Sequence, residues 1–145
     1  MNETHYRKLE HMYLGANINS RIFDTTKIEI SEASAQISLN VDEKFFHALG
    51  AIHGSVYFKL LDDAAFFAVS SLVEDVFVLT VNFNIQLLRP VNEGVITAKG
   101  VVRFRSPNLY IAESVLVNEM GKEIAFGSGN FVRSKSPLTE EIGYR

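Results

Sequence analysis

The chain has 145 residues, a formal net charge of −3 and no cysteine. This length fits one domain with its own core, so we expect residues 1–145 to form a single domain. A negative net charge argues against non-specific nucleic-acid binding, which needs a basic patch that displaces counterions from phosphates. Without thiolates, and with four histidines that share no short spacing, we expect neither a metal site nor a cofactor. The first residues lack an apolar signal segment, which predicts a cytoplasmic protein.

The N-terminal third predicts one helix and two strands. In residues 4–17 the apolar side chains of Tyr6, Leu9 and Met12 recur at helical spacing, as in a short amphipathic helix. Residues 22–30 and 33–41 are strand-like, and in the second of them apolar and polar side chains alternate strictly.

Residues 53–72 predict one long helix that is apolar on almost every side, which is typical of a buried helix. The charged residues Lys59, Asp62 and Asp63 lie near its middle, so we do not expect it to cross a membrane. Asp62 is the anomaly of this helix. A carboxylate among apolar side chains is disfavoured unless it is paired, lies at a cleft or takes part in chemistry.

The remaining chain predicts consecutive strands at residues 79–87, 95–105, 109–119 and 123–133. In the first of these, the apolar side chains form one face and Thr80 belongs to the polar face. Short turns between consecutive strands imply antiparallel pairing.

These elements predict an α+β fold in which a curved antiparallel sheet of five to six strands wraps around the long helix. The polar residues 134–145 are expected to form a loosely held tail. Unpaired edge strands would need cover, which predicts self-association with the sheets joined edge to edge.

The run His53-Gly54-Ser55, followed by Asp62 and later by Leu88-Arg89-Pro90, resembles the hot-dog-fold acyl-CoA thioesterases of the phenylacetate-degradation (PaaI-like) type. The resemblance covers about residues 50–132. The family motif is Asn, five residues, then His-Gly-Gly, with a catalytic Asp or Glu on the helix and a Ser or Thr on the following strand. In this chain His47 takes the place of the Asn, and Ser55 replaces the second Gly.

The resemblance implies catalytic roles for four residues. Asp62 would act as general base or nucleophile, and the N–H of Gly54 at the helix start would hold the thioester carbonyl. His47 would donate a hydrogen bond or transfer protons, and Thr80 would hold the water or the carboxylate. Asp62 is about 13 Å from His53 by helical rise, too far to serve the same carbonyl. The resemblance implies that Asp62 faces the Gly54 end of a partner's helix, and we expect a homodimer or a tetramer built as a dimer of dimers.

Substrate binding is assigned to side chains near the helix start and at strand ends. His53 and Ser55 flank Gly54, and His53 is expected to orient the turn rather than to react. Arg89, Arg103 and Arg105 lie at strand ends, where arginines can meet the phosphates of coenzyme A, although each also fits a solvated surface position.

The leading prediction is hydrolysis of an acyl-CoA, or a related acyl thioester, to the free acid and the thiol. A 3-hydroxyacyl-thioester dehydratase or hydratase is the alternative, because such enzymes oppose a loop histidine such as His47 to a helix carboxylate. A non-catalytic acyl-thioester-binding module is the third possibility, because the motif's Asn and second Gly are replaced. The acyl group and the choice between coenzyme A and a carrier protein are left open.

Overall fold

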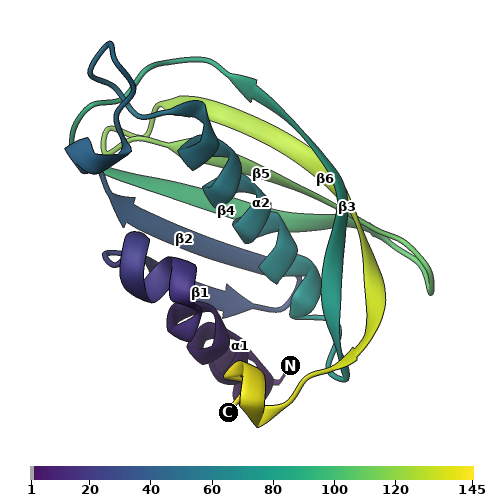
Figure 1. Cartoon of the computed structure of the whole chain (residues 1–145). Coiled ribbons are helices and arrows are strands. Elements are labelled where there is room, and N and C mark those ends of the chain that lie inside the picture. Colours follow the sequence, from purple (N-terminus) through teal and green to yellow (C-terminus); the bar gives the residue numbers. More distant parts are fainter. Residues whose placement is uncertain (1) are drawn as a thin grey trace.

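A six-stranded antiparallel sheet curls around helix α2 (Gly54–Ser70) in the computed structural model, which describes residues 2–145 (Figure 1). The strands are β1 (Lys27–Ser31), β2 (Ser34–Asn40), β3 (Val76–Leu87), β4 (Val95–Arg105), β5 (Tyr110–Val117) and β6 (Glu123–Pro137). Their order in the sheet is β1-β2-β4-β5-β6-β3, so β1 and β3 form the two edges. The predicted α+β architecture is confirmed.

Helix α2 is buried along most of its length, as its apolar sequence predicts. His53 precedes the helix, and its imidazole Nδ1 accepts the backbone N–H of Ser55 at 3.0 Å, which caps the first turn. Close packing on the sheet depends on Gly100 of β4, because a Cβ at that position would collide with the backbone of Ala64. No helix within residues 2–145 combines the length and the apolar character needed to cross a membrane.

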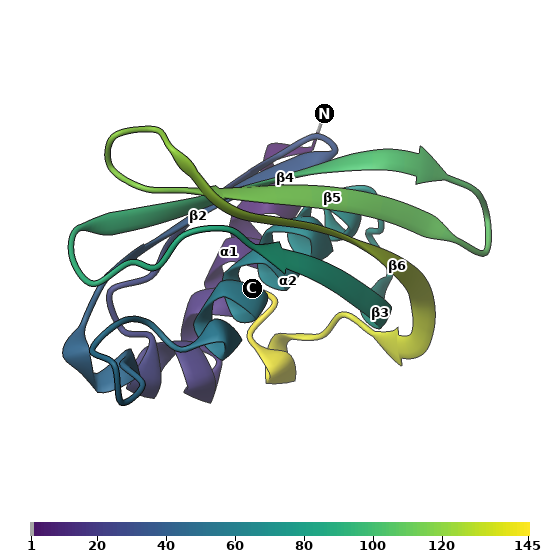
Figure 2. The same ribbon diagram turned by 90° about the horizontal axis from the view of Figure 1, so that it is seen from above.

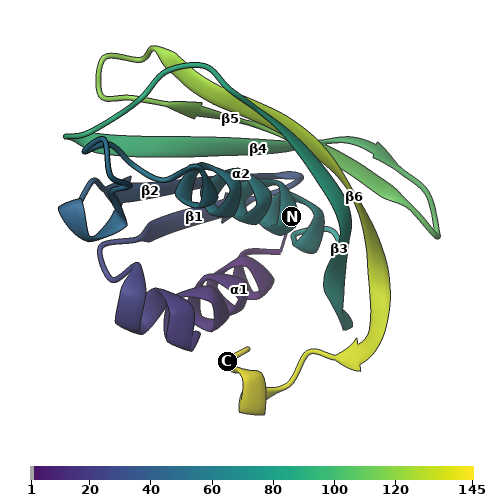
Figure 3. The same cartoon turned by 45° about the horizontal axis from the view of Figure 1, so that its top comes forward.

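Helix α1 (Glu3–Gly15) lies on the side of α2 that faces away from the sheet, so α2 is enclosed between the two (Figure 3). The ring of Tyr13 meets the ring of Phe67 edge to face at 4.9 Å between centroids. Two side chains of α1 bind the backbone of Ile30 on the edge strand β1. Arg7 donates to the Ile30 carbonyl oxygen, and Glu10 accepts the Ile30 N–H. Seen from above, the curvature of the sheet is greatest at β6 and β3 (Figure 2).

The strand predicted at residues 22–30 is wrong in its first half. Ile18–Ile22 forms a π-helical turn, η1, and β1 begins only at Lys27. The side-chain amide of Asn19 donates to the carbonyl of Tyr13 at 2.8 Å, which ties this turn back to the end of α1. Of the three isoleucines that made the segment look like a strand, Ile22 belongs to the turn, whereas Ile28 and Ile30 lie in β1.

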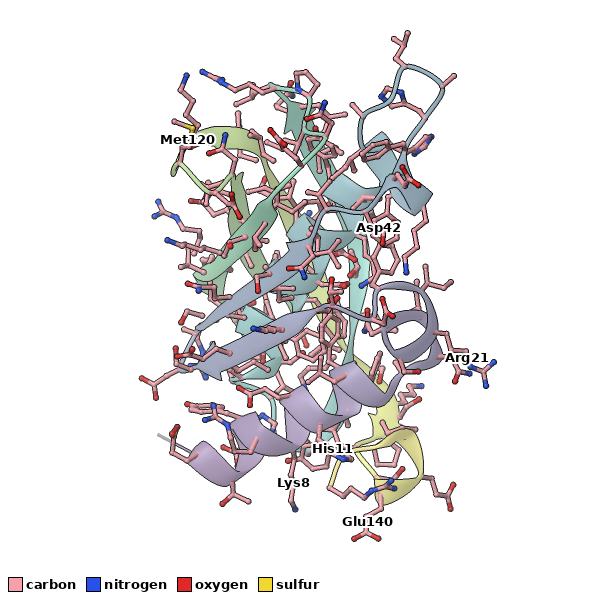
Figure 4. All side chains as sticks on the ribbon, turned by 90° about the vertical axis from the view of Figure 1, so that its left-hand side faces the viewer. Lys8, His11, Arg21, Asp42, Met120 and Glu140 are labelled. Carbon is pink, nitrogen blue, oxygen red and sulfur yellow. The ribbon has the colours of Figure 1, made fainter. Side chains whose placement is uncertain are left out.

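The C-terminal segment, expected to be loosely held, folds back onto α1 (Figure 4). Strand β6 continues to Pro137, and a 3₁₀ turn, η3, covers Glu140–Ile142. The Tyr144 hydroxyl lies 2.7 Å from Nδ1 of the buried His5, and His11 Nδ1 lies 3.0 Å from the carbonyl oxygen of Gly143. These contacts hold the segment against the helix.

Strand β3 contains a bulge that the alternating sequence did not reveal. Its pairing with β6 shifts register between Thr80 and Asn82, so that Val81 is the extra residue. Thr80 lies opposite the buried Phe131, whereas Phe83 lies opposite the buried Gly129. Because paired residues share a face, both Thr80 and Phe83 point toward α2. The prediction that Thr80 belongs to the same polar face as Asn82, Asn84 and Gln86 is therefore wrong.

Candidate active site

Asp62 and Thr80 form a contact between the middle of α2 and the inner face of β3. The Thr80 hydroxyl donates to Asp62 Oδ1 at 3.0 Å, and the Asp62 side chain is half-buried. Burial raises the pKa of Asp62 to about 6; the bond from Thr80 opposes this rise, Asp63 adds to it, and Lys59 opposes it. A carboxyl group with a pKa near neutrality can accept a proton from a reacting group at physiological pH.

A charged cluster lies directly beside Asp62. Lys59 Nζ is 2.6 Å from Asp63 Oδ2, and the Tyr13 hydroxyl donates to the same oxygen at 2.6 Å. Lys59 also donates to Asn19 Oδ1 at 2.7 Å and lies over the ring of Phe23. Asp63 is therefore a paired carboxylate. The contributions of Tyr13 and Asn19 were missed, because nothing in the sequence places α1 and η1 against the middle of α2.

A cavity of about 350 Å³ opens beside Asp62. Asp62, Asp63 and Lys59 share its wall with Thr80 of β3. The rest of the wall is mostly apolar, and it includes Met12, Ile18, Phe66, Phe67, Phe77 and Ile142. A carboxyl group with a raised pKa therefore borders an apolar space large enough for part of a small molecule.

The start of α2 lines a separate cavity of about 340 Å³, together with His47 and Arg89. The N–H groups of the first helical turn have no partner within the helix, so Gly54 offers a donor toward this space. His47 is exposed, and its Nδ1 accepts the N–H of Leu49 at 3.1 Å. The neutral imidazole therefore carries its proton on Nε2, which is a hydrogen-bond donor.

His53 and Ser55, the other predicted residues at the helix start, bind each other. Nδ1 of His53 accepts the Ser55 N–H, and the Ser55 hydroxyl lies 2.8 Å from the same nitrogen. A nitrogen that already accepts an N–H carries no proton, so the hydroxyl is the donor. These contacts cap the first turn of α2, and the role of His53 in orienting the turn rather than reacting stays a prediction.

The predicted site residues therefore fall into three groups within one chain. Asp62 and Thr80 line one cavity, whereas His47, Gly54 and Arg89 line another, and these cavities share no lining residue among those described. Arg103 and Arg105 line a third cavity with Leu72, beyond the C-terminal end of α2. Arg103 is also paired with Glu113 at 3.5 Å. No single chain brings all three groups together.

A curled antiparallel sheet around one long helix defines the hot-dog fold, and comparisons with known proteins agree with it. The sequence model of the thioesterase superfamily matches residues 49–125, more than half of the chain. The chain therefore belongs to the thioesterase superfamily. The matched segment contains Asp62 and Thr80 but neither α1 nor η3.

Solved structures with the same fold include the PaaI protein of the Escherichia coli phenylacetic acid degradation operon. It is 21% identical, with a TM-score of 0.82, and the match covers 94% of this chain and 97% of that chain. A thioesterase from Haemophilus influenzae is 19% identical, with a TM-score of 0.76 and 88% of each chain covered. No curated protein sequence matches the chain. Within residues 2–145, no three acidic or histidine side chains are grouped so as to hold a metal ion.

Proposed function

We propose that this protein hydrolyses an acyl-CoA, or a related acyl thioester, to the free acid and the thiol. The observation that carries the proposal is Asp62, a half-buried carboxyl group with its pKa raised to about 6, hydrogen-bonded by Thr80 and bordering an apolar cavity. In the general-base route, ionised Asp62 takes a proton from water while the water oxygen attacks the thioester carbonyl carbon. The C–S bond then breaks, and the proton passes to the departing sulfur.

In the nucleophilic route, a carboxylate oxygen of Asp62 attacks the carbonyl carbon, and the C–S bond breaks as the thiolate leaves. Water then hydrolyses the resulting anhydride, which releases the acid and restores the Asp62 carboxylate. In both routes negative charge develops on the carbonyl oxygen and needs hydrogen-bond donors. The N–H of Gly54 at the start of α2 is the proposed donor, with His47 Nε2–H as the second.

The proposed donors belong to a partner chain. Gly54 and Asp62 are about 12 Å apart along one helix by helical rise, and they line separate cavities among the described residues. The outer edge of β3 pairs with no strand within residues 2–145, and Leu79 and Val81 on this strand are 48% and 59% exposed. We propose that two copies join along β3, so that Asp62 of one faces Gly54 of the other.

Coenzyme A is the proposed carrier because Arg89 lies in the same cavity as Gly54, where a guanidinium can bind phosphate. Arg103 and Arg105 would reach the same coenzyme only from another protomer. We propose a cytoplasmic location on the sequence expectation alone.

The test is a panel of acyl-CoAs incubated with a free-thiol reagent, run on the wild type and on Asp62→Asn. Thiol release that falls at least 100-fold in Asp62→Asn supports the proposal. Asp24→Asn is the matched control, because Asp24 is exposed and only pairs with Lys44 on the surface. A change in enoyl absorbance without thiol release would identify a hydratase instead. Binding without turnover would identify a non-catalytic module.

A further inference from the structure

We propose that the cavity beside Asp62 is an acyl pocket for a compact, uncharged acyl group, and that α1 and the C-terminal turn set the length it accepts. This inference rests on the proposed function. Asp62 and Thr80 lie on the cavity wall. A thioester whose carbonyl group contacts Asp62 therefore places either its acyl group or its coenzyme A arm in this cavity. About 350 Å³ is at the small end of ligand pockets, so the acyl group fits and the nucleotide-bearing arm does not.

The lining of the cavity favours apolar groups. Aromatic rings of Phe66, Phe67 and Phe77 form one side, and Ile18 and Ile142 contribute aliphatic surface. Phe66 and Phe67 contact each other edge to face, with 5.0 Å between centroids, which fixes the shape of that side. An apolar acyl group gains by leaving water for such a surface.

The charges on the wall disfavour an acyl group that ends in a carboxylate. Lys59 is the one cation among the described residues that line the cavity. Its side chain is only 12% exposed, and Asp63 holds it at 2.6 Å. Asn19 and Tyr13 take two more of its contacts, at 2.7 and 3.1 Å. A carboxylate at the end of the acyl group would therefore enter a cavity whose wall already carries Asp62 and Asp63 and offers no available cation to neutralise it.

Part of the cavity wall comes from segments outside the region that matches the family. Ala16 and Ile18 follow α1, and Ile142 ends η3, whereas the family match covers residues 49–125. His11 of α1 and Glu140 of η3 lie near each other at this end of the molecule (Figure 4). The bond between His11 and Gly143 joins the two segments. We therefore expect these segments, which lie outside the family-matched region, to limit the length of the acyl group.

The experiment measures kcat/KM for thiol release with straight-chain acyl-CoAs of increasing length, and compares hexanoyl-CoA with adipoyl-CoA. We expect adipoyl-CoA to be at least tenfold poorer, since the two differ mainly by a terminal carboxylate. Ala16 is exposed, and Ala16→Leu should narrow the cavity. We expect it to lower kcat/KM at least tenfold for the longest acyl-CoA that the wild type hydrolyses well, while kcat/KM for acetyl-CoA stays within about twofold of the wild-type value. Ile142→Ala should extend the accepted length. Met120→Ala is the control, because Met120 is 86% exposed and far from η3 (Figure 4).

A second measurement uses S-alkyl-CoA thioethers, which bind but cannot be hydrolysed. Their Kd should follow the same length dependence, and Ala16→Leu should weaken only the longer members. This pattern without any thiol release would overturn the proposed hydrolysis and leave the pocket assignment standing. Equal effects of Ala16→Leu at every length, or adipoyl-CoA as good as hexanoyl-CoA, would overturn the pocket assignment, as would a Kd independent of length.

Discussion

Thr80 reaches Asp62 only because β3 bulges at Val81. The bulge allows Thr80 and Phe83, three residues apart, to point toward α2 together. Phe83 then fills the core against Gly127 and Gly129, where a Cβ on either glycine would collide with β3. Thr80 is left free to donate to Asp62 Oδ1 at 3.0 Å. One strand thus supplies both a core ring and a polar contact to the carboxyl group.

This contact predicts the pH dependence of activity. If Asp62 must be ionised, kcat/KM rises with pH through about 6 in the wild type. Thr80 hydrogen-bonds the charged form and so lowers the pKa of Asp62; in Thr80→Val this effect is lost. The midpoint should then move upward by about one pH unit. Thr80→Ser keeps the hydroxyl and should stay near the wild-type midpoint. An unchanged profile in Thr80→Val would remove Thr80 from the site.

The ionised form of Asp62 should reduce the stability of the folded protein, because burial favours the neutral form. The pKa of Asp62 is raised from 3.8 to about 6 on folding, so its stabilising contribution is complete below pH 3.8 and lost as pH rises through 6. Asp62→Asn imitates the neutral form. We expect it to raise the free energy of unfolding by about 1–2 kcal/mol at pH 8, less than the full shift because the side chain is partly exposed.

Urea unfolding at pH 8 and at pH 4.5 checks this expectation. The advantage of Asp62→Asn should shrink at the lower pH, and Asp24→Asn should show no such change. An advantage that is equal at both values would mean that burial does not raise the pKa of Asp62.

The charged cluster beside Asp62 should tune it in two opposite directions. Lys59→Met removes the cation and leaves Asp63 uncompensated, which should raise the midpoint of the pH–rate profile. Asp63→Asn removes the neighbouring carboxylate and leaves Lys59, which should lower it. We expect shifts of about half a unit or more in each direction. General damage to the fold would not produce shifts of opposite sign, so two shifts in the same direction would contradict this role.

The sequence predicted the buried helix, the antiparallel sheet and the contrast between Asp62 and its surroundings, because these depend on local periodicity and composition. The bulge at Val81 was not predictable, since strict alternation looks the same with and without it. The cluster around Lys59 depends on how α1 packs against α2, and this packing is set by contacts between residues far apart in the sequence. The C-terminal segment looked loose because its anchors, His5 and His11, lie more than 130 residues earlier.

Mixed oligomers test whether two chains share one site. Asp62→Ala and Gly54→Val should each be inactive alone; in the second, the added side chain meets Leu87, because a Cβ at position 54 would lie 3.2 Å from Leu87 Cδ1. If Asp62 faces Gly54 of the partner, mixed dimers contain one intact site and should recover up to about a quarter of wild-type activity. Sedimentation equilibrium would establish that the chains associate. A monomer that hydrolyses thioesters would contradict the shared site.

His47 provides the last prediction. Its Nδ1 is occupied by the Leu49 N–H, so Nε2–H is the donor left for a carbonyl oxygen near Gly54. Such a donor acts mainly as charge develops in the transition state, so His47→Ala should lower kcat about 100-fold with little change in KM. His47→Asn supplies an amide donor and should recover much of the loss. If Asn is as poor as Ala and the pH–rate profile loses one of its limbs, His47 transfers protons instead, which would favour the hydratase-like chemistry. If neither substitution changes turnover, another donor assists Gly54.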